Sequence, residues 1–113
     1  MVLEATRIDF REIAGGTVRN ISGHERGVEA RKKYDLDRLD AKGEVVSVII
    51  PDDIDAVAAS FFQGMFSESV KRFKSKDEFL RHYNFIAKPV MMEQILRGID
   101  RSLTERRGSA FKT

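Results

Sequence analysis

The chain has 113 residues and a mass of 12.9 kDa, which fits one domain. Its 20 Lys and Arg residues nearly balance 18 Asp and Glu residues, and this argues against a protein that coats nucleic acid through charge alone. The lack of Cys excludes a disulfide framework, a thiolate metal site and a Cys nucleophile. The sequence has no apolar run long enough to span a membrane and no signal peptide, so we expect a cytoplasmic protein.

Two short strands and a helix are predicted at the start of the chain. Alternating polar and apolar residues predict a strand over Val2–Phe10. Gly15-Gly16 predicts a turn, and Thr17–Arg19 predicts a second short strand. Ser22-Gly23-His24-Glu25 has the spacing of a capping box, so we expect a helix that continues to about Leu39.

Val45–Ile50 is an almost continuous β-branched run, which predicts a central strand covered on both faces. Ser60 is the expected cap of the next helix. Apolar residues recur in this helix at spacings of three and four: Phe61, Phe62, Met65, Phe66, Val70 and Phe73. Ser75–Glu78 is a second capping box, His82–Ala87 is an expected strand, and Pro89 opens a last helix.

Strands that alternate with helices predict an α/β sheet of about four strands with right-handed crossovers. The apolar residues of the last helix show the strongest helical period: Met92, Ile95, Leu96, Ile99 and Leu103. We expect one domain over residues 1–107 and a flexible tail over residues 108–113. The oligomeric state stays open, because Phe62 or Phe66 could lie in the core or on a dimer surface.

Few side chains are candidates for chemistry. Asp52, Asp53 and Asp55 follow the central strand, where they could bind a metal or transfer protons, or simply form a soluble turn. His24 and His82 lack the spacing of metal ligands, although a hydrolase that pairs one of them with an Asp is a third hypothesis. We therefore predict no enzyme, no catalytic residue, no metal ligand and no cofactor.

The segment from Arg19 to Lys33 is rich in cations and is the alternative functional site. Nucleotide or nucleic acid could bind there, with Arg19, Arg26 and Arg31 as the anion-binding residues. Glu25 and Glu29 are spaced to pair with these cations along a helix. The favoured interpretation is a solvated helix face, and nucleic acid is not the expected partner.

A run of short motifs resembles a known family. After the strand at Val45–Ile50, a polar loop leads to Ala59-Ser60-Phe61-Phe62-Gln63-Gly64-Met65-Phe66. Gly16, Arg19, Ser22-Gly23 and Arg26 lie upstream, and a short strand and a helix fit Phe79–Leu103 downstream. These features resemble the STAS-like domains of unknown function, which are bacterial relatives of anti-sigma-factor antagonists. The resemblance spans roughly Gly15 to Arg107.

The resemblance implies a small mixed β-sheet with helices packed mainly on one face, and a regulatory binding role instead of catalysis. Better known antagonists bind an anti-sigma kinase of the histidine-kinase ATPase type until a Ser at a helix N-terminus is phosphorylated. Their Asp-Ser-Ser-Gly motif falls on Ala58-Ala59-Ser60-Phe61. Ala59 has no hydroxyl, so the chain departs from that switch at the modified residue.

These observations lead to one main functional prediction. We expect a non-enzymatic protein-interaction module whose partner resembles a histidine-kinase ATPase. The expected partner-binding residues are those of the loop before the second long helix and of its first turn: Asp52, Asp53, Asp55, Ala59, Ser60 and Gln63.

Overall fold

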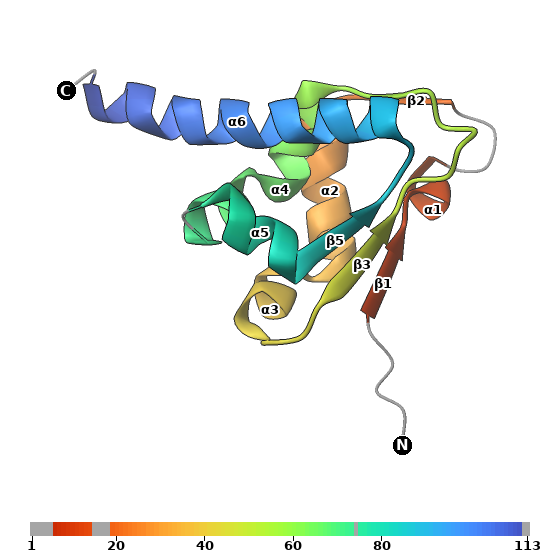
Figure 1. Cartoon of the computed structure of the whole chain (residues 1–113), viewed down its shortest axis with the longest axis horizontal. Coiled ribbons are helices and arrows are strands. Elements are labelled where there is room, and N and C mark those ends of the chain that lie inside the picture. The colour runs from red at the N-terminus through yellow and green to blue at the C-terminus, as the bar shows by residue number, and fades with distance from the viewer. Residues whose placement is uncertain (1–5, 15–18, 74, 112–113) are drawn as a thin grey trace.

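The computed structural model describes residues 6–14, 19–73 and 75–111, with side chains up to residue 104 (Figure 1). The turn predicted at Gly15-Gly16 and most of the strand predicted at Thr17–Arg19 lie outside these ranges. The elements in chain order are β1 (Thr6–Asp9), α1 (Phe10–Ala14), β2 (Asn20–Ile21), α2 (His24–Tyr34), α3 (Leu36–Ala41), β3 (Val46–Ile49), β4 (Ala56–Val57), α4 (Ala59–Phe73), α5 (Lys76–His82), β5 (Tyr83–Ile86) and α6 (Pro89–Phe111).

The described strands form two parallel sheets. The first has the order β1-β3-β5, and its register places Val46 between Thr6 and Tyr83. The second contains only β2 and β4. The α/β class and the central place of β3 are confirmed. The expectation of one mixed sheet is wrong, because the strands form two sheets and every described pair is parallel. Helices lie between the paired strands along the chain, and a connection through a helix joins strands in parallel.

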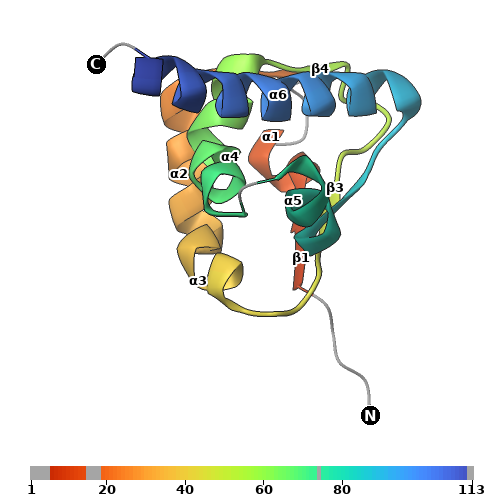
Figure 2. The same ribbon diagram turned by 60° about the vertical axis from the view of Figure 1, so that its left-hand side comes forward.

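The helices lie mainly on one side of the three-stranded sheet, with α2 and α4 side by side and α6 across one end (Figures 1 and 2). Val46 and Val48 of β3 are buried beneath them, whereas Ser47 and Ile49 point the other way and are half-buried. The prediction that β3 is covered on both faces is therefore wrong. The apolar run of β3 suggested two covered faces because it includes Ile49, but Ile49 lies on the face that no described helix covers.

The core is built around the aromatic residues of α4 and β5. The Phe66 ring lies 5.2–5.7 Å, between centroids, from the rings of Phe62, Phe79, Tyr83 and Phe85. Such pairs add about 0.5–1.5 kcal/mol each to the effect of burial. The predicted apolar stripe of α4 is confirmed, and Phe62 and Phe66 are 1% and 0% exposed, so both belong to the core.

Helices α2 and α4 touch through two glycines. A Cβ atom on Gly27 would lie 2.2 Å from the Phe61 carbonyl oxygen, and one on Gly64 would lie 2.1 Å from the His24 carbonyl oxygen. No side chain fits at either position without moving a backbone. The two helices therefore pack backbone against backbone at this crossing.

The predicted boundaries of the first long helix are wrong at both ends. Gly23 precedes the helix with φ 102°, and no side-chain hydrogen bond caps it, so the capping box predicted at Ser22 does not form. The chain leaves the helix at Asp35, which has φ 55°, and then begins α3. The second predicted capping box is confirmed, because the Glu78 N–H donates to Ser75 Oγ at 3.1 Å.

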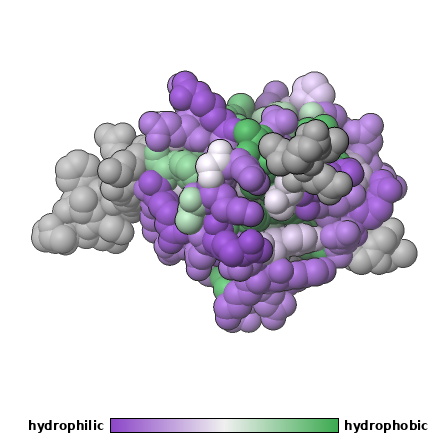
Figure 3. Space-filling model, turned by 90° about the horizontal axis from the view of Figure 1, so that it is seen from below, coloured by the Kyte–Doolittle hydropathy of each residue, from purple (hydrophilic) through white to green (hydrophobic). Residues whose placement is uncertain are grey.

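Helix α6 begins at Pro89 as predicted and continues to Phe111, beyond the predicted end of the domain at residue 107. Met91, Ile95 and Ile99 are its most deeply buried residues. No helix in the described ranges is long and apolar enough to cross a membrane. The face shown in Figure 3 is mainly hydrophilic, and hydrophobic residues show there in limited areas.

Candidate functional site

The start of α4 is tied to the segment before α2. Helix α4 begins at Ala59, and the Phe62 N–H donates to the Ala58 carbonyl oxygen. Ser60 therefore lies in the first turn and is not the cap that we predicted. Its Oγ instead accepts a hydrogen bond from the Gly23 N–H at 3.3 Å. This contact joins the beginnings of the two helices that cross at the glycines.

Two of the three predicted aspartates pair with arginines through their side chains, and the third contacts a lysine only through its backbone. Asp53 lies 3.5 Å from the Arg11 guanidinium, and the Asp52 carbonyl oxygen accepts from Lys88 Nζ at 2.9 Å. Asp55 forms an ion pair with Arg19 at 2.8 Å, and the hydrogen bond from that guanidinium lowers the pKa of Asp55. No cluster of metal-ligating side chains occurs among the residues that the structure describes.

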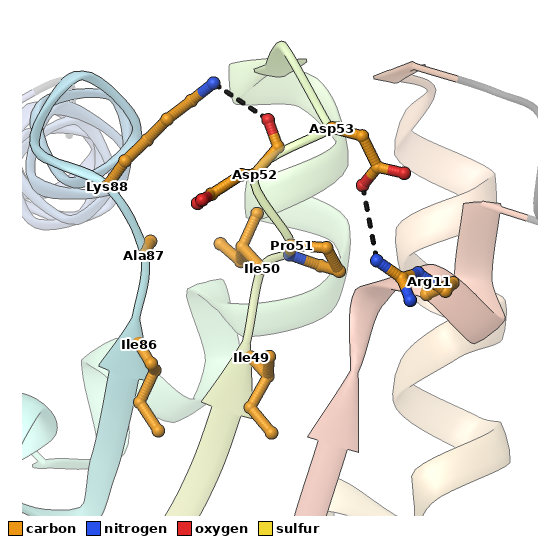
Figure 4. Close-up of a pocket in the computed structure, with 9 residues that line it drawn as sticks. All are labelled: Arg11, Ile49, Ile50, Pro51, Asp52, Asp53, Ile86, Ala87 and Lys88. Carbon is orange, nitrogen blue, oxygen red and sulfur yellow. Dashed lines mark hydrogen bonds and ion pairs between the residues drawn. The ribbon is translucent and has the colours of Figure 1, made fainter.

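A shallow depression of about 810 Å³ lies at the carboxyl ends of β3 and β5 (Figure 4). Ile49 and Ile86 form its apolar part, and Asp53 and Lys88 stand at its rim. We call it the strand-end depression; its lining residues are Arg11, Ile49–Asp53 and Ile86–Lys88. Ligands of open parallel sheets commonly bind beyond the carboxyl ends of the strands.

A second depression, of about 450 Å³, lies between the β2–β4 sheet and α6. The Val57 N–H donates to Gln94 Oε1 at 2.9 Å, which fixes α6 against β4. We call this depression the α6 groove; its lining residues are Asn20–Ser22, Ala56–Ala59, Gln94, Arg97, Gly98 and Arg101.

The predicted partner-binding residues are thus distributed over the surface around the start of α4. Asp52 and Asp53 line the strand-end depression, whereas Ala59 lines the α6 groove. Gln63 is half-buried on α4 and makes contacts of its own. Asp55 is exposed and paired with Arg19, between these regions along the chain.

The predicted anion-binding arginines do not form one cationic patch. Arg19 is paired with Asp55, and Arg26 Nη2 donates to the Ile13 carbonyl oxygen at 3.3 Å. Arg31 is only 9% exposed, so the expectation that it lies on a solvated helix face is wrong. Its guanidinium points inward and donates to the Met65 carbonyl oxygen at 2.9 Å.

Arg31 belongs to a buried polar cluster that the sequence analysis missed. At its centre is Asp40, whose side chain is fully buried. The Asp40 carboxylate accepts from Tyr83 OH at 2.5 Å, Ser69 Oγ at 2.8 Å, Arg72 Nη1 at 2.9 Å and Arg31 Nη2 at 3.1 Å. We call these five residues the Asp40 cluster. It joins α2, α3, α4 and β5 at one point.

The cluster satisfies a charge that would otherwise be costly to bury. Two guanidinium groups and two hydroxyl donors replace the water around Asp40, as a buried carboxylate requires. The exposed Asp37 also contacts Arg31, at 2.6 Å, and this hydrogen bond lowers the pKa of Asp37. No buried side-chain nitrogen or oxygen lacks a partner among the described residues. This complete pairing indicates a structural role for the cluster.

The two tyrosines of the chain should resist ionisation while it is folded. Burial raises the pKa of Tyr83 and Tyr34, and hydrogen bonds to Asp40 and Glu12 raise these pKa values further. A raised folded pKa gives stability that is fully present below the unfolded value, about pH 10, and is lost as the pH rises through the folded value. We therefore expect phenolate absorbance to appear together with loss of the helical circular dichroism. Phenolate formation near pH 10 with the helical signal intact would contradict this assignment.

The histidines differ in their surroundings. His82 is buried, and its Nε2 lies 2.8 Å from the Leu39 carbonyl oxygen. His24 is exposed at the first residue of α2. No hydrogen bond between a histidine and a carboxylate occurs within the described ranges, so the hydrolase hypothesis gains no support from the geometry.

No family model matches the chain, and searches of curated proteins and of solved structures found no match either.

Proposed function

We propose that the chain is a non-enzymatic regulatory module that binds another protein through the start of α4 and the loop before it. The observation that supports this most is the position of that loop and helix start, which contribute residues to both the strand-end depression and the α6 groove. Both depressions are open at the surface and combine apolar residues with a charged rim. This combination is typical of protein-binding surfaces.

The strand-end depression offers the clearest contact area. Ile86 is 49% exposed beside Ile49, and Arg11, Asp53 and Lys88 line the same depression beyond the pair, at the carboxyl ends of the strands. Parallel sheets are usually covered on both faces, and here the helices cover one. A partner that covers Ile49 and Ile86 would bury apolar surface, and its polar groups would face the charged rim.

The nature of the partner is proposed from the sequence motifs. The chain is similar to STAS-like domains, whose better known relatives bind ATPases of the histidine-kinase type in the cytoplasm. We propose a partner of that class. Ala59 stands where those relatives carry the phosphorylated Ser, and alanine has no hydroxyl group, so phosphorylation at this position is excluded. The hydroxyl group of the next residue, Ser60, accepts a hydrogen bond from the Gly23 N–H.

The test is a quantitative affinity purification from cells that express the protein. The Asp53→Arg variant reverses a charge at the rim and leaves the core intact, because Asp53 is exposed. The control is Glu44→Arg, an equal charge change at the exposed loop before β3, at the other end of that strand. We expect a partner that wild type and the control retain, and that Asp53→Arg retains at least about tenfold less, or 1.4 kcal/mol.

Two results would contradict the proposal. If Asp53→Arg retains the same partner as wild type, the strand-end depression is not the contact surface. If wild type enriches no protein over the affinity resin alone, the chain is not a stable binding module.

A further inference from the structure

Two arginines on one side of the α6 groove have no partner among the residues that the structure describes. Arg97 and Arg101 are exposed and line the groove. Neither forms a hydrogen bond or an ion pair with any residue that the structure describes. By contrast, Arg19 is paired with Asp55, and Arg31 and Arg72 are paired with Asp40. The guanidinium groups of the α6 groove are therefore available to a ligand.

The groove has one sign of charge. None of its lining residues is Asp or Glu, although the strand-end depression contains both Asp52 and Asp53. The first residue of α4, Ala59, also lines the groove, so the positive end of that 15-residue helix adds to the charge of the arginines. An anionic group is the complementary ligand.

The spacing of the two arginines indicates the form of the ligand. Residues four apart on a helix are separated by about 6 Å along its axis. In an extended chain, side chains on the same side repeat every two residues, at about 6.6 Å. An extended segment with acidic residues at positions i and i+2 therefore matches Arg97 and Arg101.

The rest of the lining favours a protein segment over a nucleic acid. It contains no aromatic side chain on which bases could stack. It does contain the half-buried alanines at positions 56, 58 and 59 and the amide side chains of Asn20 and Gln94. Such a surface can contact a peptide backbone and small apolar side chains.

We propose that the α6 groove binds an extended acidic segment of a partner protein, with carboxylates at alternate positions on Arg97 and Arg101. This proposal rests on the proposed function, since it names the chemistry of one part of the partner. It does not depend on the strand-end depression, so an experiment can refute binding at one surface and leave binding at the other intact.

The experiment is a ¹H–¹⁵N titration of the whole chain at low salt with two blocked pentapeptides of equal composition. In one peptide a single residue separates two glutamates, and in the other the glutamates are adjacent. We expect the first peptide to shift amides of residues 20–22, 56–59 and 94–101, and the second to bind at least about threefold more weakly. Added salt should weaken binding, because the contacts are exposed.

Matched variants assign the effect. Arg97→Glu/Arg101→Glu should reduce the affinity for the first peptide at least tenfold. Lys32→Glu/Lys33→Glu makes the same charge change at exposed positions of α2 and should leave it within twofold. The single variants Arg97→Gln and Arg101→Gln should each cause an intermediate loss of affinity for the first peptide. They replace the double charge reversal in the experiment if that variant does not fold.

Several results would overturn the proposal. Shifts that spread over Lys32 and Lys33, or that survive the reversal of Arg97 and Arg101, would show unspecific charge attraction. Equal binding of the two peptides would refute the match of spacings. Tighter binding of a single-stranded oligonucleotide of equal charge to the same amides would favour nucleic acid. If all peptides fail while Asp53→Arg still abolishes capture of a partner, only this inference fails and the proposed function stands.

Discussion

Replacement of Gly64 by Ala is expected to lower the free energy of unfolding by about 3 kcal/mol, the upper part of the range for overpacked cores. Alanine favours helix by about 1 kcal/mol over glycine, so propensity alone predicts the opposite sign. The reason for the loss is steric, because the new Cβ would lie 2.1 Å from the His24 carbonyl oxygen. Helices α2 and α4 would have to separate, and the buried contacts along both would loosen.

Gly43→Ala is the control for this experiment. Gly43 is exposed, and a Cβ atom there would meet no heavy atom within 4 Å. Chemical denaturation should show a change within about 1 kcal/mol for this variant. Gly27→Ala should be as damaging as Gly64→Ala, and the double variant should cost less than the two together, because one separation of the helices relieves both clashes. Equal stability of Gly64→Ala and Gly43→Ala would refute the close crossing.

Replacement of Asp40 by Ala should lower the free energy of unfolding by about 3–5 kcal/mol, the usual cost of removing one partner from a buried ion pair. The loss arises because Arg31 would keep a buried positive charge without its buried counterion, and only the exposed Asp37 would remain beside it. Ser69 and Tyr83, both 0% exposed, would lose the acceptor of their hydroxyl groups. Thermal and chemical denaturation would measure the change.

Asp37→Ala is the matched control, because Asp37 contacts the same arginine at 2.6 Å. Its side chain is 72% exposed, so solvent already screens this ion pair and water replaces the carboxylate when it is removed. We expect less than a third of the loss seen for Asp40→Ala. Similar losses for the two variants would mean that burial of Asp40 does not decide the strength of the cluster.

The parts of the fold that were predicted correctly are those with a clear local signal. The stripe of α4 follows from regular spacing, the start of α6 from Pro89, and the strand β3 from a β-branched run. The two-residue strand β4 and the five-residue helix α1 are too short to show a period, so they were missed. The break at Asp35 depends on a backbone conformation that the local sequence does not indicate.

The Asp40 cluster could not be predicted for a different reason. Ser69 and Tyr83 lie 29 and 43 residues from Asp40, so only the tertiary fold brings them to the carboxylate. Arg31 was assigned to a solvated face together with Lys32 and Lys33, and the structure confirms that exposure for the two lysines alone.

The predicted partner surface was divided for a geometric reason. Successive residues of a helix point about 100° apart, so Ala59 and Ser60 cannot share one face of α4. Ala59 faces the α6 groove, and Ser60 faces Gly23. The sequence identified the right stretch of chain but not the division of its side chains.

The bonds at the start of α4 affect the thermodynamics of association. Gly23 donates to Ser60, and Ala58 donates to the Ile21 carbonyl oxygen, so the backbone beside the α6 groove is already held in place. Binding would then remove little conformational entropy from this chain. The entropic cost of forming a complex falls mainly on the incoming segment. A short ligand already restricted to an extended form would gain affinity without any new contact.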